Sequence, residues 1–227
     1  MLVYNPKEPV ISIHIPKCGG ISLKSVLEHW FGDKLYFHYY HHKRGEYPPK
    51  IKIKNFITGK LKSGICIHGH FENTADVGAK EYYPEIKQYF TFVREPLEMQ
   101  ISTFWYEYNL SQKGKLYGNG KKITLNYDID EYLETSKPYS HVFFPEEMNA
   151  ENYESMLNKY YIHIGLLENY QISLNILAEK LNRPKIDLYK LNNSDRIRKP
   201  SETSVRKFKE KCLLEYKVFE YACGLNK

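Results

Sequence analysis

The chain has 227 residues, of which 42% are hydrophobic, so it can bury one substantial core and is predicted to form a single domain over residues 1–227. Its 33 basic and 27 acidic residues give a formal net charge of +6. That excess suits an anionic ligand, but it is too diffuse to indicate nucleic acid by itself, and no short basic run adds to it. No apolar stretch is long enough to span a bilayer, so we expect no membrane span.

The four cysteines indicate a reducing compartment. Cys18, Cys66, Cys212 and Cys223 share no metal-ligand or redox spacing, which is typical of free thiols. The chain also shows no signal-peptide pattern. We therefore expect a cytoplasmic protein.

The most informative stretch runs from Val10 to Phe31. Alternating β-type residues at 11–15 lead into Lys17 and the pair Gly19–Gly20. Apolar residues then recur at three- and four-residue steps, as in a helix: Leu23, Val26, Leu27 and Trp30. A strand, a glycine turn and a helix N-terminus together present free backbone N–H groups and a positive dipole end to an anion. Because Lys17 adds a mobile positive charge, this turn is predicted to bind a phosphate.

Alternating strands and helices follow along the rest of the chain. Residues 111–127 are polar, contain a G-N-G turn, and are predicted to form a flexible loop or hairpin. The whole pattern predicts an α/β fold, with a mainly parallel central sheet and helices on both faces. Strands are expected at 64–68, 88–93 and 160–164, and helices at 97–110, 168–181 and 202–223, the last with Gly224 as C-cap.

A second constellation lies in residues 91–102. Arg94 follows a hydrophobic strand at its C-terminal end, where open α/β sheets bind ligands, and Ser102 lies on the helix that comes next. If this helix folds back over the strand end, the guanidinium and the hydroxyl can hold one anion together. Taken alone, each is better explained as a surface residue, with Arg94 in a salt bridge to Glu95 or Glu98 and Ser102 facing the solvent.

A third motif is the H-G-H segment at residues 68–70. Period-two geometry puts His68 and His70 on the same side if the strand continues that far. A neutral imidazole near its ordinary pKa can take a proton from an alcohol at neutral pH, so the segment is a candidate general base. Half of a metal site is an alternative, although no third ligand has a recognisable spacing, and a structural histidine is another.

Together these motifs resemble the sulfotransferase superfamily, in its carbohydrate branch of the heparan-sulfate type. The order P-K-x-G-G-x-S at residues 16–22 is similar to the family's 5′-phosphosulfate loop, and V-R-E-P followed by Ser102 is similar to its 3′-phosphate motif. The H-G-H segment resembles the catalytic segment of uronosyl 2-O-sulfotransferases, in which the second histidine is the base. Weaker similarities lie at residues 164–170 and in the basic segment 192–202.

The resemblance implies a P-loop-like sheet and an enzyme that transfers a sulfuryl group from 3′-phosphoadenosine 5′-phosphosulfate to a hydroxyl, most simply on a carbohydrate, without a metal. His70 would then be the base, His68 a supporting hydrogen-bonding group, and Lys17 the group that stabilises the departing phosphate. The donor would be held by residues of all these motifs: Lys17, Cys18, Gly19, Gly20, Ile21, Ser22, Arg94, Ser102, Arg198, Lys199 and Ser201.

Three positions depart from the family pattern. Ile21 stands where threonine is common, so a hydroxyl contact to the 5′-phosphate is lost there, and Ser22 is the candidate to supply one. Cys18 replaces a usual threonine or serine, so that its contact is expected from the backbone N–H alone. Glu95 replaces the commoner aspartate, which is a mild change.

Other functions stay open at this point. A P-loop kinase would carry G-K-[ST], whereas Lys17 precedes the glycines, and no Mg²⁺-binding aspartate is evident after a strand. A non-catalytic module that binds nucleotides or acidic glycans would show steeply salt-dependent binding and no turnover. A sulfotransferase that acts on protein tyrosine or on a small alcohol would share the same donor residues.

The segment H-Y-Y-H-H-K-R at residues 38–44 has two interpretations. Its histidines, His38, His41 and His42, suit the wall of an acceptor groove for a sugar or an acidic chain. A solvated basic loop explains the same composition equally well.

Overall fold

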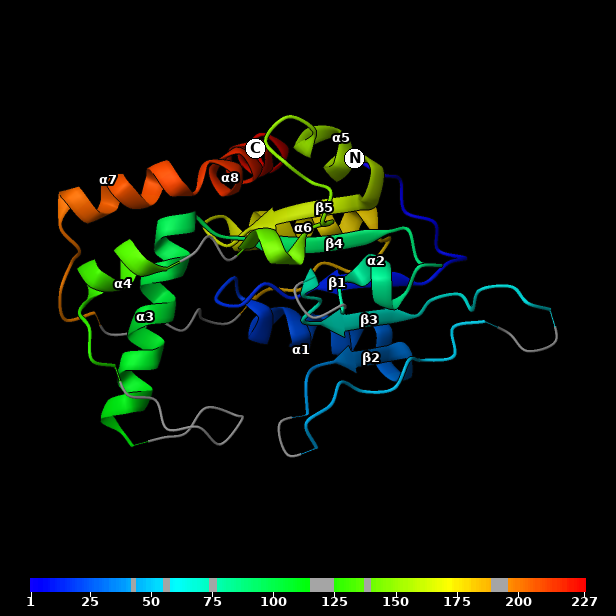
Figure 1. The fold of residues 1–227 in the computed structure, drawn as a ribbon. Coiled ribbons are helices and arrows are strands. Elements are labelled where there is room, and N and C mark those ends of the chain that lie inside the picture. The colour runs from blue at the N-terminus through cyan, green and yellow to red at the C-terminus, as the bar shows by residue number, and fades with distance from the viewer. Residues whose placement is uncertain (42–43, 55–57, 74–76, 115–124, 137–139, 189–195) are drawn as a thin grey trace.

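The protein is built on one parallel sheet. The computed structural model describes residues 1–41, 44–54, 58–73, 77–114, 125–136, 140–188 and 196–227 (Figure 1). Five strands, all parallel, are arranged in the order β2-β3-β1-β4-β5, which confirms the predicted α/β class. The strands are β1 (Val10–Ile13), β2 (Leu35–His38), β3 (Cys66–Gly69), β4 (Tyr89–Val93) and β5 (Tyr161–Leu166).

Helices cover both faces of this sheet, because neighbouring residues of a buried strand point to opposite sides. Val10 belongs to the core that is shared with α1 and α6, whereas Ile11 belongs to the core on the other face, which includes residues of α5 and α8. The helices are α1 (Gly20–Phe31), α2 (Ala79–Tyr82), α3 (Pro96–Gln112), α4 (Ile129–Thr135), α5 (Tyr153–Tyr160), α6 (Tyr170–Lys180), α7 (Glu202–Lys211) and α8 (Leu213–Leu225), with short 3-10 turns at Gly32–Lys34 and Ser140–Phe143.

A third apolar cluster joins α3, α4 and α7 beyond the end of the sheet (Figure 1). The starts of these three helices are marked by side-chain caps. Glu95 accepts the backbone N–H of Glu98 at the start of α3, and Asp128 forms a capping box at the start of α4. Ser201 caps α7 by accepting from the backbone N–H of Ser204. This cluster of three helices is connected to the sheet through α3, which follows β4 directly.

The predicted C-terminal helix over residues 202–223 is wrong, because the chain breaks at Cys212 into α7 and α8. Helix α7 packs against α4, whereas α8 packs against β5 and α5, and one straight helix does not reach both. Gly224 lies inside α8 and is not its cap. The C-cap residue is Asn226, whose Nδ2 donates to the carbonyl oxygens of Ala222 and Ile164.

Other predicted elements are present with shifted ends. The strand expected from residue 160 begins at Tyr161, because Tyr160 still belongs to α5. Within the described residues, β2, α2, α4 and α5 had not been predicted. Helix α3 continues through Gln112 into the predicted loop 111–127, and residues 115–124 of that segment lie outside the described residues.

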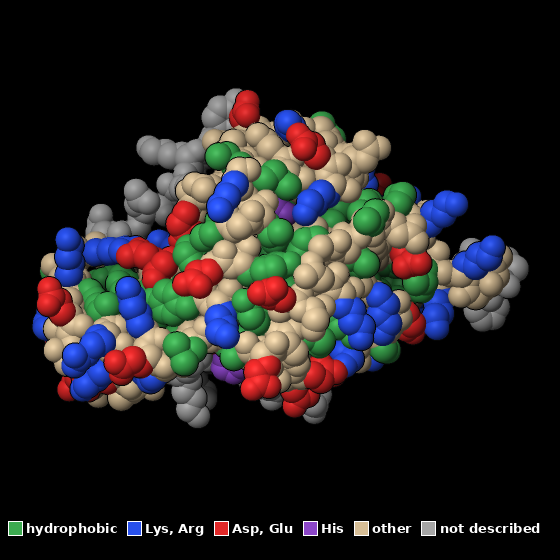
Figure 2. Space-filling model, turned by 90° about the horizontal axis from the view of Figure 1, so that it is seen from above, with side chains coloured by type: hydrophobic (Ala, Val, Ile, Leu, Met, Phe, Trp, Pro, Cys, Tyr) green, Lys and Arg blue, Asp and Glu red, His purple; other side chains and the backbone are tan. Residues whose placement is uncertain are grey.

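The charged side chains on the surface are of mixed sign, as expected from the small net charge. Basic and acidic side chains are interspersed on the face seen from above, including the end formed by α7, so no single-sign patch dominates that face (Figure 2).

The four cysteines are free, as predicted. No helix in the described part of the chain combines the length and the apolarity needed to cross a membrane.

The burial of histidines predicts acid sensitivity. His38, His68 and His163 are fully buried, and burial lowers the pKa of His38 to about 4 and the pKa of His68 and of His163 to about 3. Below about pH 6.5 the unfolded chain therefore takes up protons that the folded chain does not bind. The free energy of unfolding should be level above about pH 7.5 and should fall below pH 6.5, by up to about 1.4 kcal/mol per pH unit for each histidine.

Urea denaturation at pH 8, 7, 6 and 5 measures this dependence. His38→Phe should flatten the slope below pH 6.5, because one buried titrating group is removed. Equal stability of the wild-type protein at pH 7 and pH 5 would contradict the assignment of neutral buried histidines.

Candidate active site

The predicted phosphate-binding turn lies between β1 and α1. Lys17 and Gly19 both adopt left-handed backbone conformations, with φ of 65° and 84°. Gly19 is the N-cap residue of α1 and makes no side-chain cap, so the first amide groups of the helix have no capping side chain. A positive helix end with uncapped N–H groups and a lysine is suited to bind an anion.

Packing from both sides fixes the shape of this turn. The Tyr170 hydroxyl of α6 donates to the carbonyl oxygen of Gly19 at 2.9 Å. On the other side, the ring of His14 lies directly against the α-carbon of Gly20, where a Cβ atom would meet the ring Nε2 at 1.8 Å. Glycine is therefore required at position 20 by its neighbour and at position 19 by its backbone conformation.

Ile21 and Cys18, two of the positions that depart from the pattern of the resemblance, differ in exposure. Ile21 is 77% exposed on the first turn of α1, and Ser22 is half-buried. Cys18 is buried, and burial raises the pKa of its thiol to about 12. The Cys18 side chain is therefore a neutral packing group in this protein.

Lys17 and Arg94 lie close together at the edge of the sheet where the chain leaves two neighbouring strands in opposite directions. Lys17 follows β1 and Arg94 follows β4, and these two strands are neighbours. From β1 the chain continues through α1 to β2 on one side, whereas from β4 it continues to β5 on the other. Open α/β sheets bind ligands in the crevice at such a point.

The electrostatics of this crevice favour an anion. Burial lowers the pKa of Lys17, and the nearby positive charge of Arg94 lowers it further. The Lys17 Nζ lies 4.3 Å from the ring centroid of Tyr106 on α3, a cation–π contact. A bound phosphate would relieve the repulsion between the two cations.

Arg94 shares a carboxylate with a second arginine. Its Nη2 lies 3.4 Å from Oε2 of Glu98, and Arg196 donates two hydrogen bonds to the same carboxylate, at 3.2 and 2.7 Å. The hydrogen bonds from Arg196 lower the pKa of Glu98. Ser102 lies one turn further along α3 and is only 6% exposed. Arg196 had not been selected from the sequence, because the basic segment offers several equivalent cations.

Two of the residues predicted in the basic segment, Arg198 and Ser201, contact α4 and α7. Arg198 forms ion pairs with Asp128 and Asp130 at 3.0 and 2.7 Å, and Ser201 caps α7 while its backbone N–H donates to Asp130. Lys199 is exposed. Arg198 and Ser201 thus join α4 to α7 in this structure, and Arg196 is the member of the segment that reaches Glu98 beside Arg94. The donor-binding role of Arg198, Lys199 and Ser201 stays a prediction.

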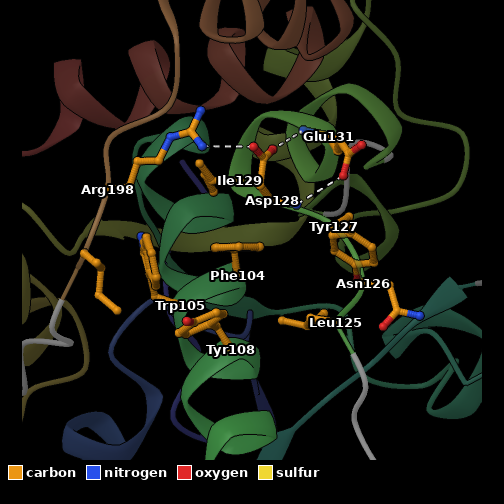
Figure 3. A pocket seen from close by; sticks show the side chains of 11 residues that line it. Phe104, Trp105, Tyr108, Leu125, Asn126, Tyr127, Asp128, Ile129, Glu131 and Arg198 are labelled. Carbon is orange, nitrogen blue, oxygen red and sulfur yellow. Dashed lines mark hydrogen bonds and ion pairs between the residues drawn. The ribbon is translucent and has the colours of Figure 1, made fainter.

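A cavity of about 460 Å³ lies between α3 and α4 (Figure 3). Its wall on α3 is formed by Phe104, Trp105 and Tyr108, and Arg198 closes one end beside Asp128. Phe104 and Trp105 are almost completely buried by their neighbours. With about 100° between successive helical residues, this wall lies on a different side of α3 from Tyr106, which contacts Lys17. The cavity is therefore separate from the crevice.

Three histidines gather at the same end of the sheet. The rings of His68 and His70 both stack on the ring of His14, with centroids 5.3 and 4.6 Å away. This arrangement confirms that His68 and His70 share one side of the sheet. His14 had not been predicted, although Ser12 pairs with His68 in register, so period two places His14 beside His70.

The two candidate bases differ in accessibility. His68 is completely buried, with Nδ1 2.9 Å from the Ser12 hydroxyl oxygen. His70 is half-buried at the end of β3, so it is the one of the two that an acceptor can approach. Burial lowers the pKa of His70 to about 4, while a hydrogen bond to the backbone of His14 acts in the opposite direction. The expectation of an ordinary pKa is thus wrong, and His70 is neutral throughout the physiological range.

The histidine cluster lacks the geometry of a metal centre. Its rings stack face to face, and among the described residues no three His, Cys, Asp or Glu side chains are arranged to hold an ion. Metal binding would need nitrogens that converge on one point.

The histidines of segment 38–44 do not form one surface. His38 is completely buried in β2 and stacks on Phe71, with ring centroids 4.4 Å apart, on the opposite face of the sheet from His70. Neither interpretation from the sequence is correct for His38, because a strand takes it into the core. His41 is exposed and pairs through its backbone with Glu46, and His42 lies outside the described residues.

Comparison with known proteins finds no protein-family model that matches this chain and no curated protein that matches it significantly. The candidate active site is therefore defined by the geometry described above and by the resemblance of its motifs.

Proposed function

We propose that this protein is a sulfotransferase that moves a sulfuryl group from 3′-phosphoadenosine 5′-phosphosulfate to a hydroxyl group, most simply on a carbohydrate. The observation that carries the proposal is the meeting of Lys17 and Arg94 at the crevice between β1 and β4, beside an uncapped helix end. Two cations from separate strands suit a ligand that carries two separate phosphate groups, as this donor does.

Each phosphate has its own set of residues in this proposal. Lys17 and the N–H groups at the start of α1 hold the 5′-phosphosulfate. Arg94 holds the 3′-phosphate. Arg196 contacts the same carboxylate of Glu98 as Arg94, which supports a role for Arg196 in holding this phosphate as well. Ser102 is the hydroxyl assigned to the same phosphate by the resemblance. Competition from Glu98 for Arg94 is weak, since their closest atoms are 3.4 Å apart.

The reaction is an in-line displacement. The acceptor oxygen forms a bond to sulfur while the bond between sulfur and the bridging phosphate oxygen breaks, through a loose transition state like that of phosphoryl transfer. Lys17 and the helix N–H groups stabilise the charge that develops on the departing phosphate. His70 accepts the proton of the acceptor hydroxyl: it is unprotonated at pH 7, and the negative charge of the bound donor would raise its lowered pKa towards the range of an effective base. His68, bonded to Ser12, supports it from inside the core.

Two alternatives share the donor site. A module that binds a nucleotide or an acidic glycan without turnover would use Lys17 and Arg94 but would not need His70. A sulfotransferase for protein tyrosine or for a small alcohol would differ only in its acceptor, so a screen of acceptors with labelled donor separates it from the carbohydrate enzyme.

Arg94→Ala should weaken the binding of adenosine 3′,5′-bisphosphate. Loss of a charge-assisted contact costs roughly 1.5–3 kcal/mol, which is about 10- to 100-fold in affinity. Wild-type protein should also bind AMP correspondingly more weakly than the bisphosphate. Isothermal calorimetry measures both, with Arg206→Ala, an exposed arginine on α7, as the matched control. Undiminished affinity in Arg94→Ala, or equal affinity for AMP, would contradict the 3′-phosphate assignment.

Lys17→Ala should lower kcat together with kcat/KM, because its contact to the leaving phosphate strengthens in the transition state. Lys17→Arg should restore the rate only in part, since a planar guanidinium does not replace a compact ammonium. Alanine is strained at a φ of 65°, so Lys17→Gly serves as the unstrained control. Similar losses in the alanine and glycine variants would point to the missing ammonium, whereas full activity in either one would remove Lys17 from the mechanism.

His70→Ala should reduce kcat by about 10²–10⁴-fold, the usual contribution of a general base, with near-normal affinity for the bisphosphate. Because the pKa of His70 is lowered to about 4, kcat/KM of the wild-type enzyme should be level from pH 6 to pH 8. Steady-state kinetics on His70→Ala, His68→Ala and the exposed control His41→Ala measure this. A more damaging His68→Ala together with a nearly silent His70→Ala would assign the base to His68 instead.

A further inference from the structure

His14 contacts both the phosphate-binding turn and the histidine cluster of the candidate active site. Its Nδ1 lies 2.9 Å from the hydroxyl oxygen of Tyr39, and its ring packs on the α-carbon of Gly20 at the start of α1. The same ring stacks on His70 with an angle of 26° between the ring planes. Its backbone N–H donates to the Gly69 carbonyl at 2.7 Å, which ties it to the end of β3.

The contacts of His70 depend on the same residue. Tyr39 approaches the His70 ring edge-on, with centroids 5.0 Å apart, beside the stacked ring of His14. The Nδ1 of His70 is buried and has no protein partner within the described residues. The orientation of this ring is therefore set by packing against His14 and Tyr39.

His14 is unsuited to accept the proton itself. Burial lowers its pKa to about 2, and the neighbouring His70 and His68 lower it as well. Burial also raises the pKa of Tyr39, so its hydroxyl stays protonated beside Nδ1. His14 and Tyr39 are therefore both neutral, so they can hold the ring of His70 in place without adding a charge to the site.

We propose that His14, held by Tyr39, is a positioning residue that fixes the base His70 relative to the phosphate-binding turn. This inference rests on the proposed function. In-line transfer requires the acceptor oxygen, the sulfur and the leaving phosphate oxygen to be aligned, with the base within hydrogen-bond reach of the acceptor hydroxyl, and an error of 1 Å can cost about 100-fold in rate. His14 directly follows β1, three residues before Lys17, and its ring stacks on that of His70, which directly follows β3, so it joins the two halves of the site.

The kinetic test is a double-mutant cycle. His14→Ala should lower kcat by about 100-fold, and Tyr39→Phe, which removes only the hydroxyl, by a smaller factor. If His14 acts through His70, the variant His14→Ala/His70→Ala should be no slower than His70→Ala alone. The matched control is His38→Phe, which removes a buried histidine on the other face and should leave kcat unchanged. Independent, multiplying losses would overturn the proposal, as would an equal loss in His38→Phe.

A spectroscopic test does not depend on turnover. In protein with ¹³C- and ¹⁵N-labelled histidine, side-chain couplings should show one fixed rotamer of His70 in the wild type and averaging over rotamers in His14→Ala and Tyr39→Phe. An unchanged single rotamer in both variants would overturn the positioning role. Should His14→Ala fail to fold, Tyr39→Phe carries the same test. Absence of sulfuryl transfer by the wild type, with the rotamer averaging present, would instead reject the proposed function alone.

Discussion

The pairing of β1 with a parallel strand on each side is the constraint on which the rest of this structure depends. Because the three strands are parallel, their carboxyl ends lie at one edge of the sheet. β1 brings His14 and Lys17 to that edge, β3 brings His70, and β4 brings Arg94. Groups that are far apart in the sequence thus meet within one site, and each is attached to a buried, hydrogen-bonded strand.

The site contains features that do not stabilise the free protein. Lys17 adopts a left-handed conformation that is unfavourable for a residue with a Cβ atom, and its ammonium lies near a guanidinium of the same sign. Such costs persist where the surrounding structure holds them in place, here through Tyr170 on Gly19 and His14 against Gly20. Anion binding would offset the repulsion, which is why these features support a ligand site better than a purely structural turn.

Burial of imidazole rings connects the chemistry to the stability of the protein. The same desolvation that keeps His70 neutral keeps His68 and His38 neutral in the core. In the proposed function, a neutral imidazole is therefore present at the site at pH 7. The consequence is a protein whose folded state does not take up the protons that the unfolded chain binds in mild acid.

The sequence by itself determined what depends on neighbours along the chain. Alternation and helical spacing predicted β1, the turn and α1, and the strand end at Arg94 followed from the hydrophobic run before it. Period two correctly placed His68 and His70 on one side. Only the tertiary structure decided which distant groups meet: the ring of His14 on His70, and Arg196 on the carboxylate beside Arg94. Burial of His38 and the break at Cys212 were likewise decided there, because strand order and helix packing depend on contacts between distant segments, which local periodicity does not encode.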